Sequence, residues 1–223
     1  MSENYLIKDL IKEKKEEYLQ LAGYRKDDNP QLWTAGCSFT TGEGVNQNEA
    51  WPWVLASRMK ISHTNLGVKS SSIAFSADQL IRSDIRTNDL IVWGLTYRNR
   101  FPYIINNKLE HLNAHNIDRY TDTDINFRAL VLNDHNLQYQ ALIHIYQVIN
   151  FVNKIGAKLI LVGMCTDEGD ELFYSDLPNY LKLTDNFIDH GTDGRHPGPS
   201  QHKIYADKIQ EYLYGMGVDD EYF

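Results

Sequence analysis

Two nearly continuous apolar runs of strand length constrain the fold of this chain more than any other feature of its sequence. They are DLIVWGL, residues 89–95, and AKLILVGM, residues 157–164. A strand with one face in water alternates apolar and polar residues, whereas a strand covered by helices on both faces is apolar throughout. We therefore expect both runs to lie inside a parallel sheet with helices on each side.

Shorter patterns alternate around these two runs. Residues 32–37 and 65–68 are predicted strands, and apolar residues recur at helical spacing in four further segments. Such an alternation of strands and helices favours an α/β fold. The predicted fold class is a three-layer α/β/α domain with a mostly parallel, doubly wound sheet of the flavodoxin-like type. The predicted helices cover residues 50–59, 73–85, 137–155 and 199–213.

The length and the hydrophobic content of the chain fit one domain. A chain of 223 residues, 42% of them hydrophobic, can form one substantial core, so a single domain is predicted over residues 1–223. Residues 5–21 place apolar residues at helical spacing among lysines and glutamates, which predicts an amphipathic N-terminal helix. Residues 97–136 break the alternation and are predicted to form a lid-like insertion, with a hairpin turn at Asn106 and Asn107.

Charge and composition argue against several classes of partner. The net charge of −8 disfavours the basic surface that nucleic acid or an anionic membrane requires. No apolar stretch approaches the ~20 residues that cross a bilayer, and the charged N-terminal residues do not resemble a signal peptide. Cys37 and Cys165 are too few for a disulfide framework and are expected to be buried thiols. We expect a soluble protein that is cytoplasmic at synthesis.

A serine stands at the abrupt end of an apolar run in WTAGCSFTTGEGV, residues 33–45, and glycines surround it. Serine and glycine are common in tight turns, so the segment could be a turn and nothing more. The alternative is that the loop exposes both the Ser38 hydroxyl and a backbone N–H to a reacting group.

A histidine on a stiff loop occurs far downstream, in DGRHP, residues 193–197. Asp193 and His196 are three residues apart, and Pro197 restricts the backbone directly after the histidine. A serine hydroxyl becomes a nucleophile when a base takes its proton, and that base needs an orienting partner. Loops at the carboxyl edge of a parallel sheet can bring such residues together. Taken singly, each residue could equally be structural.

Four segments of the chain resemble the SGNH, or GDSL-type, hydrolases. GCSFTTGEG resembles the first block of that family and DGRHP resembles its last block. NLGVKSSS resembles the block with an oxyanion-hole glycine, and VWGLTYRN occupies the place of the Gly-x-Asn-Asp block. The segments follow the family order between residues 36 and 197. The chain is also similar in style to SGNH-like proteins of tailed bacteriophages.

The resemblance implies a role for each matching residue. Ser38 is the implied nucleophile, His196 the general base and Asp193 its orienting partner. The backbone N–H groups of Ser38 and Gly67 are the implied oxyanion hole, which stabilises the negative charge of a tetrahedral intermediate. No metal ion is expected, because His190 and His202 have no cysteine or carboxylate at ligand spacing, and no cofactor is expected either.

Two residues depart from the family pattern. Cys37 replaces the usual aspartate before the serine, and Thr96 stands where the oxyanion asparagine is expected. An asparagine amide donates in a fixed geometry, whereas a threonine hydroxyl is shorter and can rotate to accept instead. Arg98, Asn99 or Arg100 could supply the missing donor.

Two classes of function follow from these patterns. The first is a serine esterase or carbohydrate deacetylase that cleaves a small acyl ester or an acetylated carbohydrate through an acyl-enzyme. The second is a non-catalytic or weakly active SGNH-scaffold module for binding or structure, serving in a larger assembly and associated with a virion if the chain is phage-encoded. Neither class requires nucleic acid or a membrane, and a homo-oligomer fits either.

Overall fold

The structure is a computed structural model that describes most of the chain. The predicted helix at residues 5–21 lies outside the described residues, as do residues 106–107 and 114–133 of the predicted insertion. The single domain over residues 1–223 therefore stays a prediction. The described residues are 29–105, 108–113, 134–164, 168–183 and 186–218.

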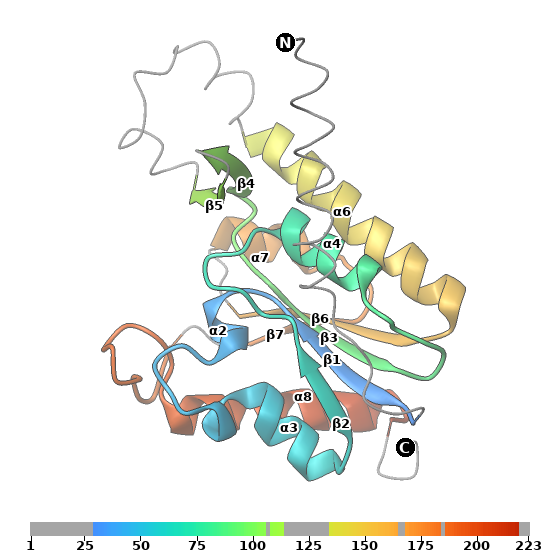
Figure 1. Cartoon of the computed structure of the whole chain (residues 1–223), viewed down its shortest axis with the longest axis vertical. Coiled ribbons are helices and arrows are strands. Elements are labelled where there is room, and N and C mark those ends of the chain that lie inside the picture. Colours follow the sequence, from blue (N-terminus) through green and yellow to red (C-terminus); the bar gives the residue numbers. More distant parts are fainter. Residues whose placement is uncertain (1–28, 106–107, 114–133, 165–167, 184–185, 219–223) are drawn as a thin grey trace.

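A five-stranded sheet forms the centre of the molecule (Figure 1). Its strand order is β2-β1-β3-β6-β7, and every pair of neighbouring strands is parallel. Helices cover both faces of the sheet, which is the doubly wound arrangement. The predicted fold class is confirmed. The strands are β1 (Gln31–Ala35), β2 (Ser62–Asn65), β3 (Leu90–Leu95), β6 (Lys158–Gly163) and β7 (Tyr180–Lys182).

The helices lie in two layers. In Figure 1, α4 and α6 cover one face of the sheet, and α3 and α8 cover the other. No helix in the described part of the chain is both long and apolar enough to span a membrane. The helices are α2 (Ser38–Thr41), α3 (Trp51–Met59), α4 (Ile73–Arg82), α6 (Asp134–Ile155), α7 (Glu168–Tyr174) and α8 (Pro199–Gly215), with a 3-10 turn at Gln47–Glu49.

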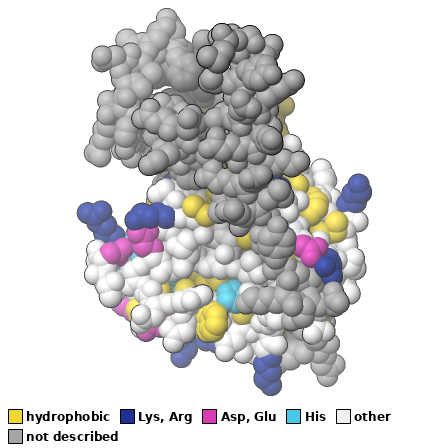
Figure 2. Space-filling model, in the orientation of Figure 1, with side chains coloured by type: hydrophobic (Ala, Val, Ile, Leu, Met, Phe, Trp, Pro, Cys, Tyr) yellow, Lys and Arg dark blue, Asp and Glu magenta, His cyan; other side chains and the backbone are white. Residues whose placement is uncertain are grey.

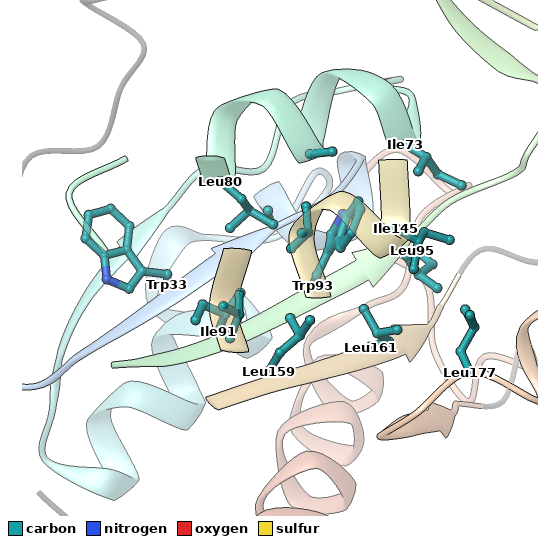
Figure 3. Close-up of a cluster of buried hydrophobic side chains, with 14 of the residues drawn as sticks. Trp33, Ile73, Leu80, Ile91, Trp93, Leu95, Ile145, Leu159, Leu161 and Leu177 are labelled. Carbon is teal, nitrogen blue, oxygen red and sulfur yellow. The ribbon is translucent and has the colours of Figure 1, made fainter. Parts of the chain in front are cut away.

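The two apolar runs are the central strands β3 and β6, as predicted. Successive side chains of a strand point to opposite faces of the sheet, so β3 contributes to two separate cores. Ile91 and Trp93 pack with Leu80 of α4 and Ile145 of α6 (Figure 3). Leu90 and Val92 pack on the opposite face against α3 and α8. Burial on both faces explains why these strands contain an uninterrupted apolar sequence.

A buried carboxylate joins β1 and β3 at their amino-terminal ends. Asp89 is fully buried, and its carboxylate accepts hydrogen bonds from Gln31 N at 2.9 Å and Arg86 N at 2.8 Å. Its second oxygen also accepts from Trp33 Nε1 at 2.9 Å. A buried charge is tolerated when donors satisfy it in this way. Asp89 therefore fixes the relative position of the two strands whose opposite ends lead toward Ser38 and Thr96.

The edges of the sheet differ from the prediction. The strand predicted at residues 65–68 is β2, Ser62–Asn65, and β7 was not predicted. β2 is polar and only partly buried, so its sequence lacks the apolar signal of the central strands. The apolar residues after it belong to a loop that still binds β1, with Leu66 N donating to Thr34 O at 2.7 Å.

The predicted hairpin is present. Strands β4 (Arg100–Ile105) and β5 (Lys108–Asn113) pair antiparallel, with Ile105 opposite Lys108.

On the face shown in Figure 2, the acidic and basic side chains of the described residues are interspersed.

Candidate active site

A glycine with no room for a side chain connects β1 to the serine. Gly36 has φ +145°, and a Cβ at this position would lie 2.4 Å from Thr40 Oγ1 and 2.7 Å from Gly94 O. Any side chain would therefore collide with both α2 and β3. Gly36 lets the chain turn sharply, and α2 begins two residues later at Ser38.

Two further glycines bring the serine loop against the histidine loop. Gly42 has φ +78° and ends α2 in a left-handed conformation. Gly44 has φ +90°, and a Cβ there would lie 3.1 Å from Asp193 Oδ1. The carbonyl of Gly44 accepts from Thr192 N at 2.8 Å. The glycines around Ser38 thus serve a sharp turn and a close approach of two loops, which the sequence alone left open.

The histidine loop is anchored at the start of α8. The Asp189 carboxylate accepts from Ser200 N at 2.9 Å and from Gln201 N at 2.8 Å. Burial opposes the ionisation of Asp189, but these backbone hydrogen bonds outweigh it and hold the pKa of the carboxyl below its usual value. Gly191 N also donates to His196 O at 2.9 Å, which closes the loop on itself.

The structure brings together the three residues predicted as nucleophile, base and orienting carboxylate. Ser38 Oγ lies 3.0 Å from His196 Nε2, within hydrogen-bonding distance, although the two residues are 158 positions apart. Asp193 Oδ2 lies 2.5 Å from His196 Nδ1. The geometry is that of a serine, a histidine and an aspartate in series. Their catalytic role stays a prediction.

The Asp193 carboxylate is held in its ionised form. Its Oδ1 accepts from His196 N at 3.0 Å and from Arg195 N at 2.9 Å. These backbone hydrogen bonds, together with the one to the His196 ring, hold the pKa of Asp193 far below its usual value. An ionised Asp193 can only accept a hydrogen bond, so it favours the tautomer of neutral His196 with the proton on Nδ1 and a lone pair on Nε2, which faces Ser38.

The predicted oxyanion donors differ in their availability. The N–H of Ser38 donates to no group in the described part of the chain. Gly67 N, in contrast, donates to Asn65 Oδ1 at 2.9 Å, so the donor predicted for the oxyanion hole is occupied. A Cβ at Gly67 would lie 2.9 Å from Thr41 N. Gly67 therefore allows close packing against α2.

Thr96 is buried directly after β3 and is held at both ends. Its Oγ1 accepts from Arg100 Nη1 at 2.7 Å, and its carbonyl accepts from the Tyr174 hydroxyl at 3.0 Å. The Arg100 guanidinium also stacks over the Tyr97 ring, 5.0 Å from its centroid. Since Arg100 fills an acceptor site of the threonine oxygen, the Thr96 hydroxyl proton is directed elsewhere.

The two other predicted donors lie in the same loop. Arg98 Nη1 binds Asp170 Oδ1 at 2.6 Å, and both side chains are largely buried. This ion pair joins the loop after β3 to α7. Asn99 is 8% exposed, and its Oδ1 has no hydrogen-bond partner among the described residues. Of the three residues considered as the missing donor, Arg100 is the one seen to bind Thr96.

One carboxylate and one lysine of the site were not predicted from the sequence. Glu43 Oε2 lies 3.5 Å from His196 Nε2, and its Oε1 forms an ion pair with Lys69 Nζ. The position of Glu43 between two glycines of the serine loop could have drawn attention to it. No local pattern links it to Lys69, which is 26 residues away.

Aromatic rings also pack against His196. The Phe39 ring packs edge-on against His196, with 5.7 Å between centroids, and Phe187 packs against Phe39 at 5.6 Å.

The Cys37 side chain is buried, as expected. Cys165 lies outside the described residues.

One group of side chains in the described part of the chain could approach a metal ion. Ligand atoms of Glu43, Asp193 and His196 all lie within 4.8 Å of one another. Both ring nitrogens of His196 already face protein oxygens, so a metal ion bound here would compete with Ser38 or Asp193 for the imidazole.

A second histidine is buried in α8, the helix that follows the histidine loop. His202 of α8 is fully buried, and its Nδ1 accepts from Trp51 N at 3.2 Å. Burial lowers the pKa of His202 to about 4, so the ring is neutral near pH 7. A neutral His202 joins α8 to α3, which positions the loop that precedes α8.

Comparisons with known proteins place the fold. No family model and no curated protein sequence matches the chain. An acetyl xylan esterase, Est2A from Butyrivibrio proteoclasticus, superposes with a TM-score of 0.57 at 14% identity, over 87% of this chain and 66% of that one. Esterase EstA from Pseudoalteromonas sp. superposes with a TM-score of 0.52 at 9% identity, over 86% of this chain and 100% of that one.

The chain has the SGNH-hydrolase fold. A third similar structure is a carbohydrate esterase whose active site is described as displaying divergent catalytic and non-catalytic binding functions. It superposes with a TM-score of 0.54 at 14% identity, over 86% of this chain and 66% of that one. This chain thus spans about two thirds of the length of both carbohydrate esterases. The SGNH resemblance inferred from four short segments is confirmed in the fold.

Proposed function

We propose that this chain is a serine hydrolase of the SGNH type that cleaves a small ester through an acyl-enzyme. The observation that carries the proposal is the 3.0 Å contact between Ser38 Oγ and His196 Nε2, with Asp193 on the other ring nitrogen. Carbohydrate esterases of the same fold support an acetylated carbohydrate or another small acyl ester as the substrate.

In the proposed reaction, His196 Nε2 takes the Ser38 proton while the serine oxygen attacks the carbonyl carbon of the ester. Asp193 orients the ring and stabilises the imidazolium that forms. The Ser38 N–H stabilises the oxyanion of the tetrahedral intermediate. His196 then gives its proton to the departing alcohol. Water, activated by the same histidine, cleaves the acyl-enzyme.

Thr96 is the proposed second oxyanion donor. β3 lies next to β1 in the sheet, with Trp93 opposite Ala35, so Thr96 leaves the sheet beside the turn to Ser38. The Arg100 contact occupies one acceptor site of the Thr96 oxygen and leaves its proton for another acceptor. In this proposal Arg98 orders the loop through Asp170.

A non-catalytic or weakly active binding module is the second candidate. The observation that favours it is the occupied N–H of Gly67, because an oxyanion hole with fewer unoccupied donors stabilises the intermediate less. A module of this kind would keep the SGNH fold and bind an acyl ester or carbohydrate without efficient turnover, alone or in a larger assembly.

A fluorophosphonate probe tests the first proposal against the second. We expect the probe to label the parent protein and to leave Ser38→Ala unlabelled. Ser57→Ala, which alters an exposed serine of α3, is the matched control and should be labelled like the parent. Failure of the parent both to react with the probe and to hydrolyse short aryl esters would favour the binding module.

A further inference from the structure

A second carboxylate faces the histidine. Glu43 Oε2 lies 3.5 Å from His196 Nε2, the same nitrogen that contacts Ser38 Oγ at 3.0 Å. Asp193 contacts the other ring nitrogen. The imidazole therefore lies between two carboxylates, one on each ring nitrogen.

Glu43 is fixed in this position by its own loop. Its backbone N donates to Ser38 O at 3.1 Å, and the residues on either side are Gly42 with φ +78° and Gly44 with φ +90°. The Oε1 atom forms the ion pair with Lys69. The contact with His196 is thus part of the turn that carries the serine.

The Oε2 atom of Glu43 is buried and has no hydrogen-bond partner among the described residues. A buried carboxylate oxygen without a donor is unfavourable. His196 Nε2 lies 3.5 Å from this oxygen, and it carries a proton when the imidazole is protonated. Glu43 Oε2 therefore gains a hydrogen-bond donor in the state that forms when Ser38 gives up its proton.

We propose that Glu43 is a positioning residue that stabilises the protonated form of His196, and that Lys69 moderates this effect by neutralising the Glu43 charge. Its meaning for catalysis rests on the proposed hydrolase function. As the Ser38 oxygen bonds to the acyl carbon, the carbonyl electron pair moves to the oxygen and the serine proton moves to Nε2. Glu43 accepts a hydrogen bond from Nε2–H until that proton passes to the departing oxygen.

Two other titratable groups near His196 do not change their charge in the neutral pH range. Asp193 is ionised over the whole neutral range because its pKa is held far below the usual value. His202 is neutral there because burial lowers its pKa to about 4. Among the described residues, the titratable and charged groups that face His196 or are coupled to it are Asp193 of its own loop, Glu43 of the serine loop, Lys69 of the loop after β2, and His202 of α8. Arg195 precedes His196 in the chain, and its backbone N donates to Asp193.

Titration of the His196 ring by NMR tests the proposal whether or not the protein is active. Glu43→Gln removes the facing charge and should move the midpoint to lower pH by about half to one pH unit. Lys69→Met leaves Glu43 without its counter-charge and should move the midpoint to higher pH. Because both variants break the same ion pair, a purely structural role predicts shifts in the same direction. Opposite shifts support the proposal.

The double variant and a surface control complete the experiment. Glu43→Gln combined with Lys69→Met should titrate like Glu43→Gln alone, because Lys69 acts through Glu43. Asp78→Asn breaks the exposed ion pair with Arg82 and should leave the midpoint unchanged. An unchanged midpoint in Glu43→Gln, or shifts of the same sign in both single variants, overturns the proposal.

Activity separates this proposal from the proposed function. If the protein hydrolyses an aryl acetate, the pH at half-maximal kcat/KM should move in each variant with the NMR midpoint. Opposite NMR shifts in a protein that turns over no ester would support the electrostatic role of Glu43 and count against the hydrolase. Turnover with no NMR shift in Glu43→Gln would do the reverse.

Discussion

The two halves of the site differ in how their donors and acceptors are used. On the side of the serine and histidine loops, Ser38, His196 and Asp193 contact one another in series. On the side of the loops after β2 and β3, Gly67 and Thr96 bind other groups of the protein instead. Under the proposed hydrolase function, the contacts that would activate the serine are already formed in this structure, whereas the oxyanion would be stabilised by fewer unoccupied donors.

The largest expected effect concerns the first half. His196→Ala should reduce the kcat of aryl acetate hydrolysis by about 10⁴-fold or more, because the serine loses its base. Steady-state kinetics measure the loss, and circular dichroism checks that the variant is folded. A loss of less than tenfold would show that the series of contacts does not act as a catalytic unit.

The turn before the serine is the next most sensitive feature. Gly36→Ala places a Cβ against Thr40 and Gly94 at a φ that side chains rarely adopt. It should lower the free energy of unfolding by about 3 to 4 kcal/mol. Gly215→Ala is the matched control, since a Cβ there meets nothing within 4 Å. Urea denaturation of both variants measures the difference, and equal stabilities would contradict the steric account.

The buried His202 should make the free energy of unfolding depend on pH. His202 has a pKa of about 4 when folded, against about 6.5 in an unfolded chain, so the unfolded state binds more protons between these values. The contribution of neutral His202 to the free energy of unfolding is complete above about pH 6.5 and is lost as the pH falls toward 4.

Between pH 7.5 and 5 the loss should be about 2 kcal/mol, measured as a change in the free energy of unfolding in urea. The lowered pKa values of Asp189 and Asp193 act in a separate window, because their stabilisation is lost below about pH 4. His202→Gln should remove most of the loss between pH 7.5 and 5. Retention of the full loss in that variant would assign it to other groups.

The smallest expected effect concerns Thr96, the proposed oxyanion donor after β3. Thr96→Val removes the hydroxyl and should lower kcat about tenfold, because one oxyanion donor is lost from a site with few others. Thr96→Ser keeps the hydroxyl and is the matched control. If both variants turn over the aryl acetate like the parent, Thr96 contributes nothing to the oxyanion hole.

Much of this architecture could be predicted from the sequence, because its causes are local. Burial on both faces gave β3 and β6 their apolar runs, and the helical spacing indicated α4 and α6. The edge strands β2 and β7 were misplaced or missed because an edge strand is short and partly exposed, so its sequence carries a weak signal. The alternation of strands and helices predicted a mostly parallel sheet, whereas the order of its strands was read from the structure.

The residue types and spacing in the two loops, together with the SGNH resemblance, also predicted that Ser38, His196 and Asp193 form a series. The other groups that surround the site could be identified only from the folded chain. Gly67 donates to Asn65, Arg98 binds Asp170, and Glu43 faces His196. The physical reason is that side-chain partners are chosen where loops from different strands converge, and most of these partners are too distant in sequence for a local pattern to join them.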